Sequence, residues 1–394
     1  MEKPAAPKDP TALTRRQMLG LTTSVLAAAG AAAAALGVGV PSARAIPHPG
    51  AKHVPLENFV HDLEAGEGWV GAGGSAKEST VAELPIARSI AGVSMRLQPG
   101  GLRELHWHAI AAEWAYIIKG NVRTTVIAPN GQAEQDDFGP GDVWYFPKGH
   151  GHALQGLGPG EAHFILGFDD GNFSEFGTFS ITDWLARTPR HVLERNLRLP
   201  AAAFAAFPKS ESYIVQGQVP PAAPAALRNP QIETAQVAHK YRLDAAPATE
   251  FEGGDLRVVS QKEFPISTTL TGARMNLKPG SLREMHWHPN ADEWQFYLSG
   301  QARVTIFGAH GRVLTHEVGP GQVAFIPQGF GHFVEQIGPE TTQVLILFNS
   351  PAYEEISLSS WLGANPAAML ADNLGVSEET VRALPSRYRG IIGS

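Results

Sequence analysis

The sequence predicts an all-β protein made of two similar domains, each an antiparallel sandwich or barrel, with short flanking helices and a signal peptide in front. Three observations carry this prediction. Short segments alternate apolar and polar residues between turns that contain glycine or proline. A set of polar residues returns 180 residues later, as His106 does at His286. A basic segment followed by an apolar one opens the chain.

The first 45 residues are predicted to be an export signal outside the fold. Arg15 and Arg16 precede a mainly apolar run over residues 18–40, and Ala43 and Ala45 supply an A-x-A cleavage site. The arginine pair is typical of a twin-arginine signal. The alternative is a membrane anchor, but the run is mostly alanine and glycine and therefore only weakly apolar. We expect export by the twin-arginine route to the periplasm or the medium, with no stable membrane anchor.

Composition narrows the function classes. The formal net charge is -7 and the pI is about 6.1, which gives no indication of a nucleic-acid partner. The chain has no cysteine, so disulfides, thiolate nucleophiles and thiolate metal sites are excluded. Its 43% hydrophobic and 18% charged residues suffice for large buried cores.

The repeat sets the predicted boundaries. We expect an N-terminal domain over residues 46–208 and a C-terminal domain over residues 241–394. Residues 209–240, rich in proline and alanine, are predicted to be the linker. Helical stretches are expected at 180–189, 201–207 and 358–370, outside the repeated segments.

One strand in each domain carries two histidines on one face. In "GGLRELHWHAIAAEWAYIIKG" (100–120), His106 and His108 point the same way because side chains of a strand alternate. Glu113 follows on the next strand, and His152 comes from a distant strand behind a proline-glycine turn. The second domain repeats the set at positions His286, His288, Glu293 and His332.

Three imidazoles and one carboxylate indicate a metal site. Buried without partners, these groups would cost several kcal/mol. A divalent transition metal such as Mn or Fe suits three nitrogen ligands and one oxygen, and an octahedral ion keeps two positions open. Zinc usually takes fewer ligands. The alternative, histidines on a solvated face or in core hydrogen bonds, is disfavoured because the whole pattern occurs twice.

These motifs resemble the two signature motifs of the cupins. The first, G-x5-H-x-H-x4-E-x6-G, runs from Gly100 to Gly120 and from Gly280 to Gly300; the second, G-x5-P-x-G-x2-H, ends at His152 and His332. "LRELHWH", "WYFPKG", "FDDGNFSE" and "TFSITDWLARTP" resemble the bicupin oxalate decarboxylases in particular. The resemblance implies two jelly-roll β-barrels, each binding one Mn²⁺. It also implies cleavage of oxalate to formate and carbon dioxide, with dioxygen as co-catalyst, in homotrimers or homohexamers.

The resemblance also implies catalytic residues. Arg103 becomes a substrate clamp, with Arg283 as its counterpart in the second domain. By strand alternation Arg103 does not share the face of the ligands, so we expect it to reach the site through a bend at "GGLR"; the alternative is a salt bridge at the rim. Glu175 becomes the proton-handling residue of a lid. Glu335, three residues after His332, is expected beside the second metal.

The lid departs from the family pattern. Between 168 and 184 the first domain is three residues longer than the second, which is what a lid over a metal site would require. It reads "SEFGT", where Phe176 and Gly177 replace two polar residues of the family. Oxalate oxidase, producing hydrogen peroxide, is therefore the first alternative. Another bicupin metal-dependent dioxygenase or isomerase would need a larger pocket, and a binding or storage bicupin would be expected to lose ligands that this chain keeps.

Overall fold

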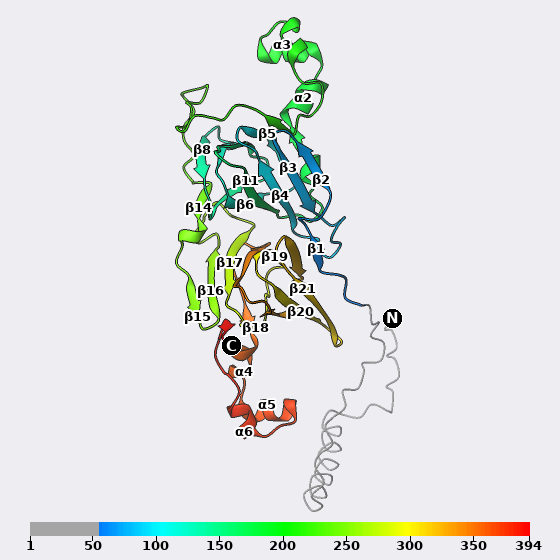
Figure 1. Cartoon of the computed structure of the whole chain (residues 1–394), viewed down its shortest axis with the longest axis vertical. Coiled ribbons are helices and arrows are strands. Elements are labelled where there is room, and N and C mark those ends of the chain that lie inside the picture. The colour runs from blue at the N-terminus through cyan, green and yellow to red at the C-terminus, as the bar shows by residue number, and fades with distance from the viewer. Residues whose placement is uncertain (1–54) are drawn as a thin grey trace, which may run out of the picture. The chain divides into compact units, whose positions relative to one another are not determined.

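The computed structural model describes residues 55–394, so the predicted signal peptide lies outside the described residues (Figure 1). The described chain is mostly β-structure in four antiparallel sheets, two for each repeat, as predicted. None of its helices combines the length and the hydropathy needed to cross a bilayer.

Two sheets form the first barrel, with the strand orders β14-β9-β6-β11-β4-β3-β2 and β12-β5-β10-β7-β8, and β13 also pairs with β5. Its own strands are β2 (Gly68–Gly71), β3 (Gly74–Ser79), β4 (Ala91–Leu97), β5 (Gly101–Trp107), β6 (Glu113–Lys119), β7 (Val122–Ile127), β8 (Ala133–Phe138), β9 (Asp142–Phe146), β10 (Gly151–Gly156), β11 (Ala162–Phe168), β12 (Phe179–Ser180) and β13 (Ile214–Gln216).

The second barrel repeats this arrangement, with the orders β1-β22-β19-β24-β17-β16-β15 and β21-β20-β23-β18-β25, and β26 also pairs with β18. Its own strands are β15 (Thr249–Phe251), β16 (Gly254–Val259), β17 (Thr271–Leu277), β18 (Leu282–Trp287), β19 (Glu293–Ser299), β20 (Ala302–Gly308), β21 (Arg312–Val318), β22 (Gln322–Ile326), β23 (Gly331–Gln336), β24 (Thr342–Phe348), β25 (Ile356–Ser357) and β26 (Ile391–Ile392).

The two barrels exchange edge strands, which was not predicted. Strand β1 (Val60–Asp62) precedes the first barrel in the chain but pairs with β22 of the second. Strand β14 (Lys240–Arg242) leads into the second barrel but pairs with β9 of the first. Each exchange covers an edge strand that would otherwise expose unpaired backbone groups. The sheets therefore do not separate at the predicted sequence boundaries.

The segment predicted as a linker is more than a connection. Strand β13 within it pairs with β5, the strand that carries the first two histidines. Thr234 forms a bridge with Ala133 at the end of β8. Part of the segment 209–240 therefore belongs to the first barrel, because the backbone of 214–216 adds a strand to its sheet.

Short helices follow each barrel: those at 181–187, 201–206 and 358–363 lie in the predicted ranges, whereas those at 190–197 and 378–382 were not predicted. Ser180 and Ser357 cap the first helix of each set, since their hydroxyls accept from the backbone N–H of Asp183 and Ser360. Figure 1 shows α2 and α3 beyond the first barrel and α5 and α6 beyond the second. The helices are α2 (Ile181–Arg187), α3 (Arg190–Leu197), α4 (Leu358–Gly363), α5 (Ala367–Leu374) and α6 (Glu378–Arg382), with 3-10 turns η1 (Glu175–Gly177), η2 (Ala201–Ala206) and η3 (Leu243–Ala245).

Each barrel has an apolar core, and a third apolar cluster joins residues of both barrels. In this shared cluster Trp114 and Trp294 are fully buried. Each tryptophan lies over a glycine of the other barrel: a Cβ added to Gly272 would lie 2.2 Å from Trp114 Cζ2, and one added to Gly92 would lie 2.2 Å from Trp294 Cζ2. Only glycine allows so close an approach, so the packing between the barrels follows the repeat.

Candidate metal centres

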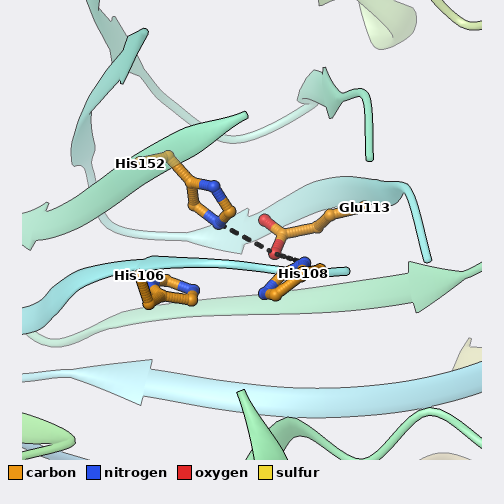
Figure 2. Close-up of side chains that lie close together, drawn as sticks. All are labelled: His106, His108, Glu113 and His152. Carbon is orange, nitrogen blue, oxygen red and sulfur yellow. Dashed lines mark ion pairs between the residues drawn. The ribbon is translucent and has the colours of Figure 1, made fainter. Parts of the chain in front are cut away.

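The first predicted cluster is assembled by strands β5, β6 and β10. His106 and His108 come from the end of β5, Glu113 begins β6, and His152 lies on β10 (Figure 2). The four side chains are buried, with at most 3% of any residue exposed. Their ligand atoms all lie within 4.8 Å of one another. The structure thus brings together four residues that the sequence spreads over 46 positions (152 − 106).

Backbone carbonyls orient two of these imidazoles. Nδ1 of His106 donates to the carbonyl of Glu104 at 2.6 Å, and Nδ1 of His152 donates to the carbonyl of His150 at 2.8 Å. A proton on Nδ1 leaves the lone pair of Nε2 free for a cation. Burial, together with the nearby Arg103, holds the pKa of His106 well below its usual value, so this imidazole is neutral.

The unsatisfied atoms of the cluster fit a metal ion. Nε2 of His106, His108 and His152 and Oε2 of Glu113 are all buried without a hydrogen-bond partner. Such atoms are costly unless something takes up their lone pairs. The other carboxylate oxygen, Glu113 Oε1, accepts from the indole N–H of Trp144 at 2.6 Å. The residues therefore fit a divalent cation with three nitrogen ligands and one oxygen.

The second cluster has the same composition on β18, β19 and β23. Nδ1 of His286, His288 and His332 donates to the carbonyls of Glu284, Glu354 and Phe330, respectively. Glu293 Oε2 lies 3.0 Å from Nε2 of both His288 and His332. Its Oε1 accepts from the amide of Gln295 at 2.8 Å, whereas an indole serves Glu113 in the first barrel.

Arg103 reaches the first cluster, but not through the expected bend. The pairing of β5 with β10 shifts between His106 and Arg103, which places a β-bulge at residues 104–105 instead of at "GGLR". The bulge inserts one residue and so turns Arg103 onto the face of the histidines. Arg103 is fully buried, and its Nη1 has no hydrogen-bond partner. It therefore lies in the site and is not a rim residue.

Glu175 lies beside Arg103 in the 3-10 turn η1. Arg103 Nε donates to Glu175 Oε1 at 2.7 Å, and Arg103 Nη2 donates to the hydroxyl of Thr178 at 2.6 Å. Glu175 Oε2 lies 3.7 Å from His108 Nε2. Burial, reinforced by the negative charge of Glu113, outweighs Arg103 and raises the pKa of Glu175 to about 7.

Tyr213 was missed because it belongs to the predicted linker. Its ring lies 4.3 Å from Arg103 Cζ, and its hydroxyl is buried without a partner. Its backbone has a φ of 55°, a left-handed conformation that is unusual for tyrosine. Glu104 stabilises this conformation, because its Oε1 accepts from the N–H of Tyr213 at 2.7 Å. The only sequence signal was the short β-like run "YIV" (213–215), which begins at this residue.

The expected position of Glu335 is wrong. On β23 buried and half-exposed residues alternate, so Glu335 points to the opposite side from His332. Its side chain is 41% exposed and lies 3.9 Å from Arg303 at the surface. Three residues is an odd number of steps along a strand, which is why the spacing places this carboxylate on the far face.

Glu355 occupies the place expected for Glu335. It lies 2.6 Å from Arg283 Nη2 and accepts from the hydroxyl of Tyr353 at 2.5 Å and from that of Tyr388 at 3.3 Å. The unchanged repeat offset would have found it, since 175 + 180 = 355. Phe179 pairs with Trp107, and Ile356 pairs with the equivalent Trp287, so Phe179 and Ile356 are equivalent positions. The three extra residues of the first loop are therefore 176–178, directly after Glu175.

The two loop carboxylates have opposite pKa shifts. Burial alone would raise the pKa of Glu355, but the charge of Arg283 and the hydrogen bonds from Arg283 and Tyr353 outweigh it and lower the pKa. The first barrel has Phe173 where the second has Tyr353, so Glu175 lacks that donor. Glu355 is therefore ionised, whereas Glu175 can hold a proton near neutral pH.

The Cupin family matches residues 70–203 and 241–382. Oxalate decarboxylase OxdC of Bacillus subtilis (strain 168) is 38% identical over 87% of this chain and 89% of its own length. A probable oxalate decarboxylase of Arthroderma benhamiae is 33% identical over 81% of this chain and 79% of its own. A solved structure of the Bacillus subtilis enzyme, concerned with its Mn(II) centres, superposes with a TM-score of 0.82 at 37% identity, over 88% of this chain and 91% of that one.

Proposed function

Because the chain belongs to the bicupin oxalate decarboxylases of the cupin family, we propose that it splits oxalate into formate and carbon dioxide at the cluster of the first barrel. The observation that carries this proposal is the buried pair of Arg103 and Glu175 beside that cluster. A small dianion would meet a cation, a fixed guanidinium and a carboxyl group that can hold a proton.

We propose Mn²⁺ in both clusters, two ions per chain. The first would be held by His106, His108, Glu113 and His152, and the second by His286, His288, Glu293 and His332. When bound, the first ion supplies a redox-active Lewis acid to which a carboxylate of oxalate can attach. The Mn(II) centres of the Bacillus subtilis relative support this choice. Dioxygen is proposed as a co-catalyst that is not consumed.

Arg103 is proposed to bind and orient the substrate. Its Nε and Nη2 are committed to Glu175 and Thr178, and its Nη1 is buried and unpaired. A substrate carboxylate near Nη1 would give this atom a partner through a charge-assisted hydrogen bond. The unpaired hydroxyl of Tyr213 offers a second donor close by. Both groups thus supply fixed donors for negative charge on the substrate.

Glu175 is proposed to deliver the proton. When the carbon–carbon bond of the oxalate dianion breaks, one carbon leaves as carbon dioxide and the other takes up one proton to become formate. The raised pKa, about 7, keeps Glu175 protonated in mildly acidic solution. Its buried Oε2 has no hydrogen-bond partner among the described residues, and His108 Nε2 lies 3.7 Å away, so no hydrogen bond to a neighbouring side chain holds this proton.

Oxalate oxidation is the second candidate, favoured by the lid sequence. Phe176 and Gly177 follow Glu175, and Phe176 is 39% exposed. A lid that opens more readily would leave the carbon without its proton, and two electrons would pass to dioxygen. Oxalate, dioxygen and two protons would then give two molecules of carbon dioxide and one of hydrogen peroxide.

The second cluster is proposed to be structural or an accessory redox centre. Arg283 is buried there and is bound to Glu355, whose lowered pKa keeps it ionised. An ionised carboxylate held by an arginine and two tyrosines is a poor proton donor. Arg283 thus neutralises Glu355 and is not proposed to clamp substrate.

Export and assembly are proposed from the sequence and the surface. We propose export by the twin-arginine route to the periplasm or the medium. Trp184 and Trp361 occupy equivalent helices and are 63% and 56% exposed. Large exposed aromatic residues on both barrels suit burial between protomers, which supports a homotrimer or homohexamer. Light scattering on the purified protein would measure the assembly.

The activity test uses Mn-loaded protein and oxalate in air-saturated, mildly acidic buffer, with formate and hydrogen peroxide measured together. We expect mainly formate, and a loss of about 10²–10⁴-fold in its rate for Glu175→Gln, the usual effect of removing a general acid. Glu335→Gln, on the opposite face of β23, is the matched control. Peroxide as the main wild-type product would favour the oxidase, and neither product would contradict action on oxalate.

A further inference from the structure

A second carboxylate, that of Glu78 on β3, holds the turn that carries Glu175 through hydrogen bonds. The hydroxyl of Ser174 donates to Glu78 Oε1 at 2.9 Å and lies 3.0 Å from Oε2. The backbone N–H of Glu175 donates to Glu78 Oε2 at 2.9 Å. The N–H of Phe176 in turn donates to Ser174 Oγ at 3.3 Å. One side chain therefore holds the start of the turn at two points.

This attachment complements the one at the end of the turn. Thr178 accepts from Arg103 Nη2 at 2.6 Å, and Glu175 itself accepts from Arg103 Nε. The 3-10 turn η1 thus lies between a strand-borne carboxylate and a strand-borne guanidinium. Without the hydrogen bonds to Glu78, the hydrogen bonds described here that still join the turn to a strand are those from Arg103.

The second barrel lacks this arrangement. Strand register makes Val258 the equivalent of Glu78, since Glu78 pairs with Val93 and Val258 pairs with Ala273, 180 residues further on. The second loop is held instead by its own cluster, because Nδ1 of His288 donates to the carbonyl of Glu354 at 2.7 Å. A strand-borne carboxylate thus holds the loop only in the barrel whose loop has the three extra residues.

We propose that Glu78 is a positioning residue that holds the lid closed. It fixes the turn at Ser174 and Glu175 and so keeps the Glu175 carboxyl against Arg103. The inference deepens the proposed function and rests on it for its product readout. Glu78 itself does not touch the metal ligands. It acts through the backbone of Glu175, so it governs how often the proton donor is in place.

The test compares the full Mn-loaded protein with Glu78→Val, which installs the residue that the second barrel already tolerates at this place. Hydrogen–deuterium exchange of a peptide covering 172–180, measured without oxalate, reports the lid directly. We expect about tenfold faster exchange there, because two acceptors for the turn are lost. A peptide from β23 should exchange as in the wild type.

With oxalate, Glu78→Val should lower the formate rate about tenfold and raise the ratio of peroxide to formate, since the proton donor is less often in place. Glu78→Gln should have a smaller effect, because its amide oxygen still accepts from the Glu175 N–H. Glu67→Gln, an exposed carboxylate just before β2, should leave both readouts unchanged and controls for lost charge.

If hydrogen–deuterium exchange of the 172–180 peptide is unchanged in Glu78→Val, the proposal that Glu78 holds the lid is wrong. Faster exchange with an unchanged ratio of products, in protein whose wild type makes formate, would overturn the positioning role. If the wild type makes no formate at all, the proposed function fails, and the exchange result still decides by itself whether Glu78 holds the loop. Should Glu78→Val not fold, the same criteria apply to Glu78→Ala, which also removes both acceptors.

Discussion

At the scale of single residues, the two barrels use the same pair of groups for different purposes. Each has a buried arginine bound to a loop glutamate, Arg103 with Glu175 and Arg283 with Glu355. The difference lies in the neighbours, because Tyr353 and Tyr388 donate to Glu355, whereas Phe173 offers Glu175 no donor. Identical charges therefore give one carboxyl group that holds a proton and one that stays ionised.

The raised pKa of Glu175 predicts the pH dependence of formate production. Below a pKa of about 7 the carboxyl carries the proton that the reaction consumes, and above it the carboxyl is ionised. The rate should therefore fall as the pH rises through 7, approaching about tenfold for each further unit. Steady-state formate rates across this range, with circular dichroism to verify folding, would check this. A rate that rises with pH would contradict the role of Glu175.

The ion pair of the second barrel should be important for stability. Glu355→Ala leaves Arg283 buried without a counter-charge, which costs about 3–5 kcal/mol of the free energy of unfolding. Glu335→Ala, at the exposed position on β23, should change it by less than about 0.5 kcal/mol. Urea denaturation of both variants measures this contrast. Equal destabilisation would mean that Glu355 is not a buried partner.

At the scale of the elements, β5 organises the first site through its bulge. The extra residue lets Arg103 and His106 share a face and turns Glu104 toward the segment 211–213 and helix α2. The carboxylate of Glu104 accepts from the N–H groups of Ser212 and Tyr213 and from the hydroxyl of Thr182. One buried side chain thereby joins three elements around the site.

Glu104→Ala should destabilise the first barrel and impair substrate binding. It leaves the buried N–H of Tyr213 without its acceptor, at a cost of about 1–3 kcal/mol, whereas the N–H of Ser212 still donates to the hydroxyl of Thr182. Tyr213 would then relax from its left-handed backbone, so KM for oxalate should rise. In Glu284→Ala the matching loss is smaller, since Gly390 replaces Tyr213 there and adopts φ 62° without strain. Denaturation and kinetics of both variants test this, and an unchanged KM in Glu104→Ala would contradict it.

At the scale of the described molecule, the barrels are joined by exchanged strands and by reciprocal packing. Strand β1 completes a sheet of the second barrel and β14 one of the first. Trp114 and Trp294 each fill the space over a glycine of the other barrel. Neither barrel thus has a complete sheet from its own repeat alone, and we expect the two to unfold together.

Glycine substitutions at this contact test that expectation. In Gly92→Ala or Gly272→Ala the new Cβ would lie 2.2 Å from a tryptophan ring carbon, so the barrels must shift. Overpacking of this kind costs about 1–3 kcal/mol, and the two variants should behave alike. Gly160→Ala, where nothing lies within 4 Å, is the control. Calorimetry should show one transition at a lower temperature; two separate transitions would mean that the barrels unfold independently.

The local pattern of the sequence was enough to predict the β class, the repeat, part of the helices after each barrel and the two clusters of histidine and glutamate. Alternation, turn residues and the spacing H-x-H act over a few neighbouring residues, so they can be read without the fold. The fixed offset of 180 residues could also have identified Glu355, because it persists up to that residue. Reliance on the spacing after His332 led instead to Glu335, on the wrong face of its strand.

Only the tertiary structure decided what depends on contacts between distant segments. The β-bulge that turns Arg103 inward is a register shift between β5 and β10, and no local pattern records it. Tyr213 enters the site because β13 pairs with β5, and Glu78 meets Ser174 across 96 residues. The strand exchange and the opposite pKa shifts of Glu175 and Glu355 arise in the same way. Each depends on which groups become buried beside one another, and burial is a property of the packed chain.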